Sequence, residues 1–149
     1  MKTVFQVQEV GLKYGSYINV AKKKIGNSSD AADFLRTAMN SDLLNGQEMF
    51  LMVCLNRDNK VIAYSHCFTG GATSVVVDPK VIFRTALLSG ATSIIVGHNH
   101  PSGNLNPSDE DCRMTKRLVD AGKALALHVV DHLIITEGGH YSFADEGQI

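Results

Sequence analysis

The stretch that decides the fold runs from Ser93 to Asp111 and reads SIIVGHNHPSGNLNPSDED. Its first part, Ser93 to Val96, is short, apolar and rich in β-branched residues, which predicts a buried strand. Strand side chains alternate between two faces, so we expect His98 and His100 to point to the same side. Pro101 lacks the backbone N–H of a strand ladder, so the strand should end there, with both imidazoles at its terminus.

A helix is predicted to begin directly after this loop, at Ser108. Ser-x-x-Asp is the pattern of a capping box, and acidic residues suit the positive end of the helix dipole, so this pattern alone needs no metal. Asp111, however, shares a helix face with Thr115 and Leu118 and therefore opens an inward-facing stripe. An unpaired carboxylate is unfavourable there, and a divalent metal is its natural partner.

His98, His100 and Asp111 together supply three ligands for one metal ion. Three protein ligands leave a fourth position for water, as in catalytic rather than structural zinc sites. Paired histidines at a strand end can also be ordinary hydrogen-bonded residues. The inward position of Asp111 is what favours the metal site over that alternative.

Composition predicts a single soluble domain over residues 1–149. Hydrophobic residues make up 44% of the chain and charged residues 19%, and the formal net charge of −1 gives no electrostatic case for nucleic-acid binding. The three cysteines form no Cys-x-x-Cys pair, which argues against disulfides and a thiolate zinc site; we expect Cys67 and Cys112 to fill the core. Without an apolar targeting region or a membrane-spanning run, we expect a cytoplasmic protein with no membrane contact.

Strands and helices interleave along the chain, which predicts an α/β fold with a mixed β-sheet flanked by helices. The predicted strands cover residues 4–14, 48–55, 60–68, 75–77, 93–100, 128–136 and 141–143. The predicted helices follow caps at Ser28 or Ser29, at Asp78-Pro79 and at Ser108, the last of them ending near Gly122.

The predicted 48–55 strand is apolar at both its odd and its even positions, so both of its faces should be covered. Glu48 is the exception at its start, and spacing alone favours a surface glutamate at the end of a strand. In the later 128–136 strand, His128 and His132 are expected on one face. A histidine there is either a hydrogen-bonded core residue or a support for the metal ligands.

The pattern His-x-His-Pro, six intervening residues and Ser-x-x-Asp resembles the metal-binding motif of the JAMM (JAB1/MPN) metallohydrolases. More narrowly, the chain resembles the RadC family over about residues 27–147. The other matching pieces are Glu48-Met49-Phe50 with Leu55-Asn56, Gly70 to Ser74, Asp78 to Phe83 and Asp131 to Ile135.

This resemblance implies the JAB1/MPN fold, an α-β-α arrangement of cytidine-deaminase-like type. The metal-site core would span about residues 46–147, after a strand and helix within 1–45. Many RadC-like proteins carry an N-terminal helix-hairpin-helix region associated with DNA contact, and residues 1–45 lack that pattern. The chain therefore looks like the short form, which weakens an inherited DNA-repair role.

The resemblance also implies roles for individual residues: His98, His100 and Asp111 would hold Zn²⁺, Glu48 would be the general base, and Ser108 would stabilise an oxyanion. The implied activity is hydrolysis of an amide or isopeptide bond in a peptide or protein substrate by a metal-activated water. A DNA-repair-associated accessory protein and a non-catalytic MPN-type interaction module are the alternatives. A nucleobase deaminase would need His-x-Glu and Pro-Cys-x-x-Cys, which the sequence lacks. The residues specify neither the substrate nor the oligomeric state.

Overall fold

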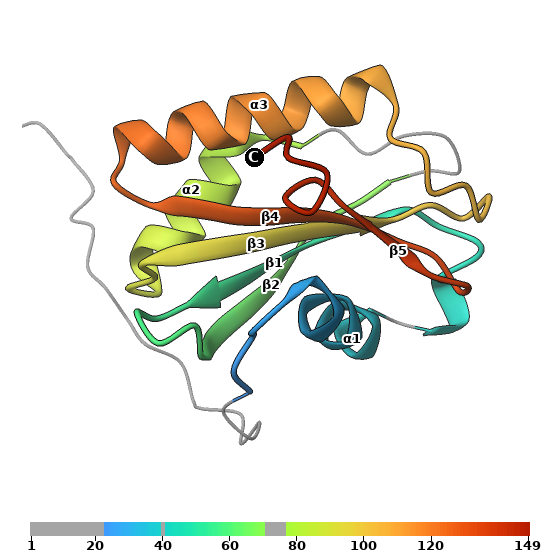
Figure 1. Cartoon of the computed structure of the whole chain (residues 1–149), viewed down its shortest axis with the longest axis horizontal. Coiled ribbons are helices and arrows are strands. Elements are labelled where there is room, and N and C mark those ends of the chain that lie inside the picture. The colour runs from blue at the N-terminus through green and yellow to red at the C-terminus, as the bar shows by residue number, and fades with distance from the viewer. Residues whose placement is uncertain (1–22, 40, 71–76) are drawn as a thin grey trace, which may run out of the picture.

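The computed structural model describes residues 23–39, 41–70 and 77–149, and in them a mixed β-sheet lies between helices (Figure 1). The sheet order is β2-β1-β3-β4-β5. The strands are β1 (Met49–Leu55), β2 (Val61–Thr69), β3 (Ser93–Asn99), β4 (His128–Ile135) and β5 (His140–Ser142). β3 pairs antiparallel with β1 and parallel with β4, so the predicted α/β fold with a mixed sheet is confirmed.

Helices cover both faces of the sheet, because β1 is apolar on both sides and fully buried. Met49 and Leu51 pack with α1 (Ser28–Ala38) on one face. Phe50 and Met52 pack on the other face, which α2 (Pro79–Leu88) and α3 (Asp109–Ala124) cover (Figure 1). The result is the expected α-β-α layering.

The helix starts follow the predicted caps with one correction. α1 is capped by Asn27, whose side chain accepts from the Asp30 N–H at 2.9 Å; Ser28, an expected cap, is the first helical residue. The cap is the residue that still has extended backbone, and here that is Asn27. At α2 the prediction is confirmed, since Asp78 accepts from the Lys80 N–H at 2.9 Å and Pro79 lies in the first turn.

A bulge in β4 changes which of its histidines faces the interior. Ile94 pairs with Val129, but the next residue, Ile95, pairs with Asp131, so Val130 is an extra residue. One extra residue reverses the alternation of faces. His132 is therefore buried while His128 is exposed, and the expectation that the two share one face is wrong.

Other sequence predictions either fall outside the described residues or differ from the structure. Residues 4–14 and 75–76 lie outside the described residues, and Val77 is described but belongs to no strand. Cys112 is exposed, so the expectation that it fills the core is wrong: it follows the inward-facing Asp111 by one helical position and points outward. Cys67 is half-buried and packs against the core. None of the helices in the described part of the chain has the length and apolarity to cross a membrane.

Candidate metal centre

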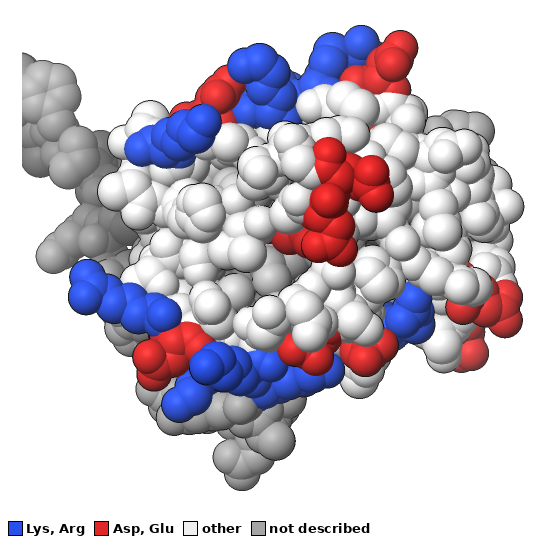
Figure 2. All heavy atoms as spheres, in the orientation of Figure 1, with Lys and Arg blue, Asp and Glu red and all other residues white. Residues whose placement is uncertain are grey.

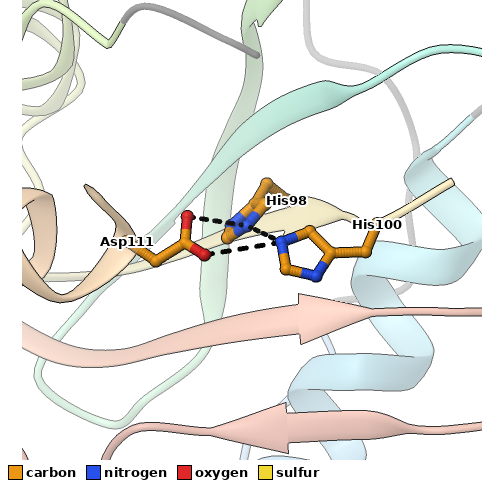
Figure 3. A group of neighbouring side chains, drawn as sticks. All are labelled: His98, His100 and Asp111. Atoms are coloured by element: carbon orange, nitrogen blue, oxygen red, sulfur yellow. Dashed lines mark hydrogen bonds and ion pairs between the residues drawn. The ribbon is translucent and has the colours of Figure 1, made fainter. Parts of the chain in front are cut away.

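Three side chains meet where β3 ends and α3 begins (Figure 3). His98 lies near the end of β3, His100 just beyond it, and Asp111 in the first turn of α3. Nε2 of His98 is 3.0 Å from Nε2 of His100 and 3.2 Å from Oδ1 of Asp111, and Nε2 of His100 is 3.5 Å from Oδ2 of Asp111. One ligand atom from each residue lies within 4.8 Å of the others, so the three predicted ligands form a group that could hold a metal ion.

Local capping holds Asp111 in this place. The hydroxyl of Ser108 accepts from the Asp111 N–H at 3.1 Å, and Oδ2 of Asp111 accepts from the Ser108 N–H at 2.7 Å. This is the capping box expected from the sequence. Oδ1 of Asp111 is left facing His98, so the capping bond and the contact with His98 use different oxygens of one carboxylate.

The hydrogen bonds of His100 leave its inner nitrogen suited to a metal. Nδ1 of His100 is 2.7 Å from the carbonyl oxygen of Asn104. A carbonyl only accepts, so Nδ1 carries the proton of the neutral ring, and Nε2 of that neutral form presents a lone pair toward His98 and Asp111. Two imidazole nitrogens and a carboxylate, closely spaced and aimed at one point, fit a divalent transition metal such as zinc.

The carboxylate of Asp111 is held ionised. Burial alone would raise the pKa of Asp111, but the close contacts with His100 and His98 and the hydrogen bond from the Ser108 N–H outweigh burial and hold that pKa well below its usual range. The same contact with Asp111 raises the pKa of His100, although burial of the ring opposes the shift. The site thus has the negative charge that a cation requires.

Glu48 lies directly before β1 and interacts electrostatically with all three ligand residues. Burial raises the pKa of Glu48. The neighbouring His98 and His100 lower this pKa and Asp111 raises it, and the net shift is upward. A carboxyl with a raised pKa beside a candidate metal site is better matched to proton transfer near neutral pH than a surface glutamate is.

Asn99 places Glu48, a role that the sequence did not reveal. Its Oδ1 accepts from the Met49 N–H at 2.7 Å, and its Nδ2 donates to the carbonyls of Leu44 at 2.6 Å and Gln47 at 2.9 Å. The amide therefore fastens the main chain on both sides of Glu48 to the end of β3. The sequence does carry one signal: Asn99 is a polar residue between the candidate ligands His98 and His100. Strand alternation points its side chain to the opposite, buried face.

A further histidine lies behind His98. Nε2 of His132 is 2.8 Å from Nδ1 of His98, and Nδ1 of His132 is 2.6 Å from the hydroxyl oxygen of Thr115. His132 is fully buried, whereas His128 takes no part in this contact and is exposed. Of the two histidines that the sequence offered as supports, the structure places only His132 against a ligand.

The fold and this site define a class of α/β domain with a candidate metal centre at the end of the central strand. Residues 25–148 match the RadC-like JAB domain, and the chain belongs to that family. The resemblance to RadC proteins seen in the sequence is thereby confirmed.

Relatives of this family bear the name UPF0758. The chain is 42% identical to such a protein from Flavobacterium johnsoniae over 84% of its own length and 53% of the relative's. It is 32% identical to one from Methanosarcina barkeri over 95% of the chain and 60% of that protein, and 44% identical to one from Gloeothece citriformis over 70% and 44%, respectively. The chain thus spans about half the length of the curated relatives that it matches.

Proposed function

We propose that this chain is a zinc-dependent hydrolase that cleaves amide or isopeptide bonds in a peptide or protein substrate. The observation that carries the proposal is the convergence of His98, His100 and Asp111 beside the half-buried Glu48. Two imidazoles and a carboxylate match the three-ligand sets of catalytic zinc sites, in which a fourth position stays open. Placement at a strand end, where a loop begins, also suits chemistry.

Zinc, when bound by His98, His100 and Asp111, would lower the pKa of water and polarise the scissile carbonyl. Glu48 would take a proton from the attacking water as the new C–O bond forms. It would then deliver this proton to the amine nitrogen as the C–N bond breaks, so that one carboxyl serves as base and then as acid. The upward shift in the pKa of Glu48 supports both roles.

Ser108 would donate a hydrogen bond to the developing oxyanion. Its hydroxyl oxygen accepts from the Asp111 N–H, and this leaves the hydroxyl hydrogen available as a donor. The capping box fixes the position of the hydroxyl at the start of α3. Removal of one such donor typically costs on the order of 2.7–4 kcal/mol in transition-state stabilisation.

Metal content tests the proposed site directly. Protein purified without chelator and supplied with zinc should retain about one zinc per chain, in keeping with a single three-ligand site. His98→Ala and Asp111→Ala should both lose it, because each removes one of three ligands. Wild-type protein that retains no zinc after removal of the excess would contradict the proposal and favour a non-catalytic interaction module.

Glu48→Gln tests the proposed base. The assay uses a panel of fluorogenic peptide amides and Nε-lysyl isopeptides, and we expect the variant to lose roughly 10²–10⁴-fold in rate on any substrate that the wild type cleaves. Zinc content should stay at the wild-type level, since Glu48 is not one of the grouped ligands. Glu137→Gln is the matched control on an exposed glutamate, and full activity of Glu48→Gln would remove Glu48 from the mechanism.

Charge on the described surface does not favour a DNA-contact function. The formal net charge is −1, and on the face shown in Figure 2 basic side chains alternate with acidic ones along the rim. Contacts to DNA phosphates would need a basic surface and would give affinity that falls steeply with salt. Tight binding of duplex DNA with such a salt dependence would favour the accessory role over hydrolysis.

A further inference from the structure

His132 is held rigidly in the interior behind the candidate ligands. Its ring stacks on Phe143, with centroids 4.8 Å apart and planes at 4°, and Phe50 lies on another side at 5.9 Å. The residue is 0% exposed. The ring therefore cannot turn without disrupting the core, and its two nitrogens stay aimed at His98 and Thr115.

Thr115 determines which nitrogen of His132 carries the proton. Its hydroxyl donates to the main-chain carbonyl of Asp111, four residues earlier in α3, at 2.7 Å. A hydroxyl has a single hydrogen, so toward His132 the same oxygen acts as an acceptor, and Nδ1 of His132 is the donor. Nε2 of His132 then carries a lone pair.

The position of the proton on His132 also determines which nitrogen of His98, a candidate metal ligand, is protonated. Because Nε2 of His132 is an acceptor, Nδ1 of His98 must donate to it across 2.8 Å. Nε2 of His98 is then unprotonated and faces Nε2 of His100 and the carboxylate of Asp111. With His100 fixed in the same way by the Asn104 carbonyl, both imidazoles present lone pairs to one point.

The opposite arrangement of hydrogens along this chain would prevent His98 from binding a metal. If Thr115 donated to His132 instead, His132 would donate to His98, and Nε2 of His98 would carry a hydrogen pointing at Asp111. A protonated nitrogen cannot ligate a metal. The bond from Thr115 to the Asp111 carbonyl favours the arrangement that leaves Nε2 of His98 free. Through His132, Thr115 also connects His98 on β3 to Asp111 on α3.

We propose that Thr115 and His132 are positioning residues of the metal centre, which hold His98 in the Nδ1–H tautomer and so keep Nε2 free for the metal. This inference rests on the metal site of the proposed function. It adds a second layer of two buried residues, one from α3 and one from β4, behind the three ligands. Partners of this kind orient ligating histidines, and their loss typically weakens metal binding by roughly 10–100-fold.

Zinc affinity of three threonine variants tests this arrangement. Thr115→Val keeps the shape of the buried side chain and removes the hydroxyl, and we expect zinc binding to weaken by roughly 10–100-fold in competition with a chromophoric chelator. Thr115→Ser retains the hydroxyl and should bind zinc with about the wild-type affinity. Thr37→Val is the matched control, because Thr37 makes the same hydroxyl-to-carbonyl bond within α1, to Asp33 at 2.8 Å, with no histidine attached.

The tautomers can be read directly by ¹⁵N–¹H correlation spectra of histidine-labelled protein, with and without zinc. We expect His98 and His132 as Nδ1–H tautomers in both states. A proton on Nε2 of His98, or wild-type zinc affinity in Thr115→Val, would overturn the inference while leaving the proposed function intact. Wild-type protein that binds no zinc contradicts the proposed function instead, and the spectra of that metal-free protein still decide the tautomer of His98.

Discussion

Asn99 carries more of the site's geometry than its neighbours in the motif would suggest. It is fully buried, lies between two candidate ligands, and makes three hydrogen bonds to main-chain groups near Glu48. Those main-chain groups exchange hydrogen bonds with water for hydrogen bonds with the side-chain amide of Asn99. A change at this position therefore affects both stability and the placement of the proposed base.

Asn99→Ala should lower the free energy of unfolding by more than an ordinary truncation. The substitution leaves the Met49 N–H and the carbonyls of Leu44 and Gln47 without their partner, and an unsatisfied buried group costs about 1–3 kcal/mol. Urea unfolding measures the loss. Asn45→Ala is the control, since that amide is exposed and, among the described residues, bonds to the exposed Glu137, so its effect should stay within about 0.5 kcal/mol.

The buried ring of His132 should make the metal-free protein sensitive to mild acid. Burial first of all, and then His98, hold the pKa of His132 well below its ordinary value of 6.5. Below about pH 6.5 the unfolded chain therefore binds a proton that the native state refuses, and the free energy of unfolding falls as the pH falls. The slope for one such group reaches about 1.4 kcal/mol per pH unit.

Urea unfolding between about pH 5 and pH 6.5, in the presence of a chelator, measures this effect as the difference in slope between wild type and His132→Gln, because the raised pKa values of Glu48 and Asp131 give contributions of opposite sign that both proteins share. The raised pKa of His100 gives a contribution that is fully present below pH 6.5, and the lowered pKa of Asp111 one that is lost only nearer pH 4, so both are constant in this window. His132→Gln should flatten the slope. An unchanged slope in that variant would assign the acid sensitivity to another group.

At the scale of elements, α3 does two separate tasks at its two ends. Its N-terminus carries the capping box that sets Ser108 and Asp111. Toward its C-terminus, Gly122 allows the helix to approach the chain that leads into β4: a Cβ there would lie 2.4 Å from the Leu127 carbonyl oxygen and 3.1 Å from Val129. The absence of a side chain at Gly122 therefore sets how closely the helix packs on the sheet.

Gly122→Ala should destabilise the protein although alanine is the better helix former. Helix propensity alone would favour alanine by about 1 kcal/mol, but the contact is with backbone, which cannot move aside cheaply. We expect a net loss of roughly 1–3 kcal/mol in thermal or urea unfolding, as for other overpacked sites. Gly138→Ala is the control, because nothing lies within 4 Å of its added Cβ; equal stability of both variants would show that α3 can shift outward.

At the scale of the whole molecule, the candidate metal centre joins β3 to α3, elements separated by the loop from His100 to Ser108. A ligand that binds only the native state stabilises it by mass action. Zinc at 100 times its dissociation constant should therefore add about 2.7 kcal/mol. For a chain of this size the midpoint of thermal unfolding should rise by roughly 5–11 °C.

Thermal unfolding with and without zinc measures this stabilisation. His100→Ala removes a ligand that is only half-buried, so the variant should fold and show no zinc-dependent rise. A rise of the same size in wild type and His100→Ala would place the stabilising ion elsewhere in the chain. Addition of a chelator should return the wild type to its metal-free midpoint.

Several features of the fold and site followed from local sequence. The two-faced apolar pattern of β1, the end of β3 just before Pro101 and the capping box at Ser108 each depend on residues only a few positions apart. Backbone geometry turns such short-range patterns into strands and helix starts without reference to the rest of the chain. The three candidate ligands were found because they sit at these predicted ends, whereas Glu48 was singled out only by the resemblance to RadC proteins.

Other features exist only because distant segments meet. Asn99 bonds to residues some 50 positions earlier, His132 faces His98 because one extra residue in β4 reverses its alternation, and Thr115 reaches His132 from another element. No pattern within a single segment encodes these contacts. The sequence determined by itself which residues could ligate a metal and on which elements they lie. Only the tertiary structure decided how the buried residues behind them are paired, because pairing depends on register and on the close approach of separate elements.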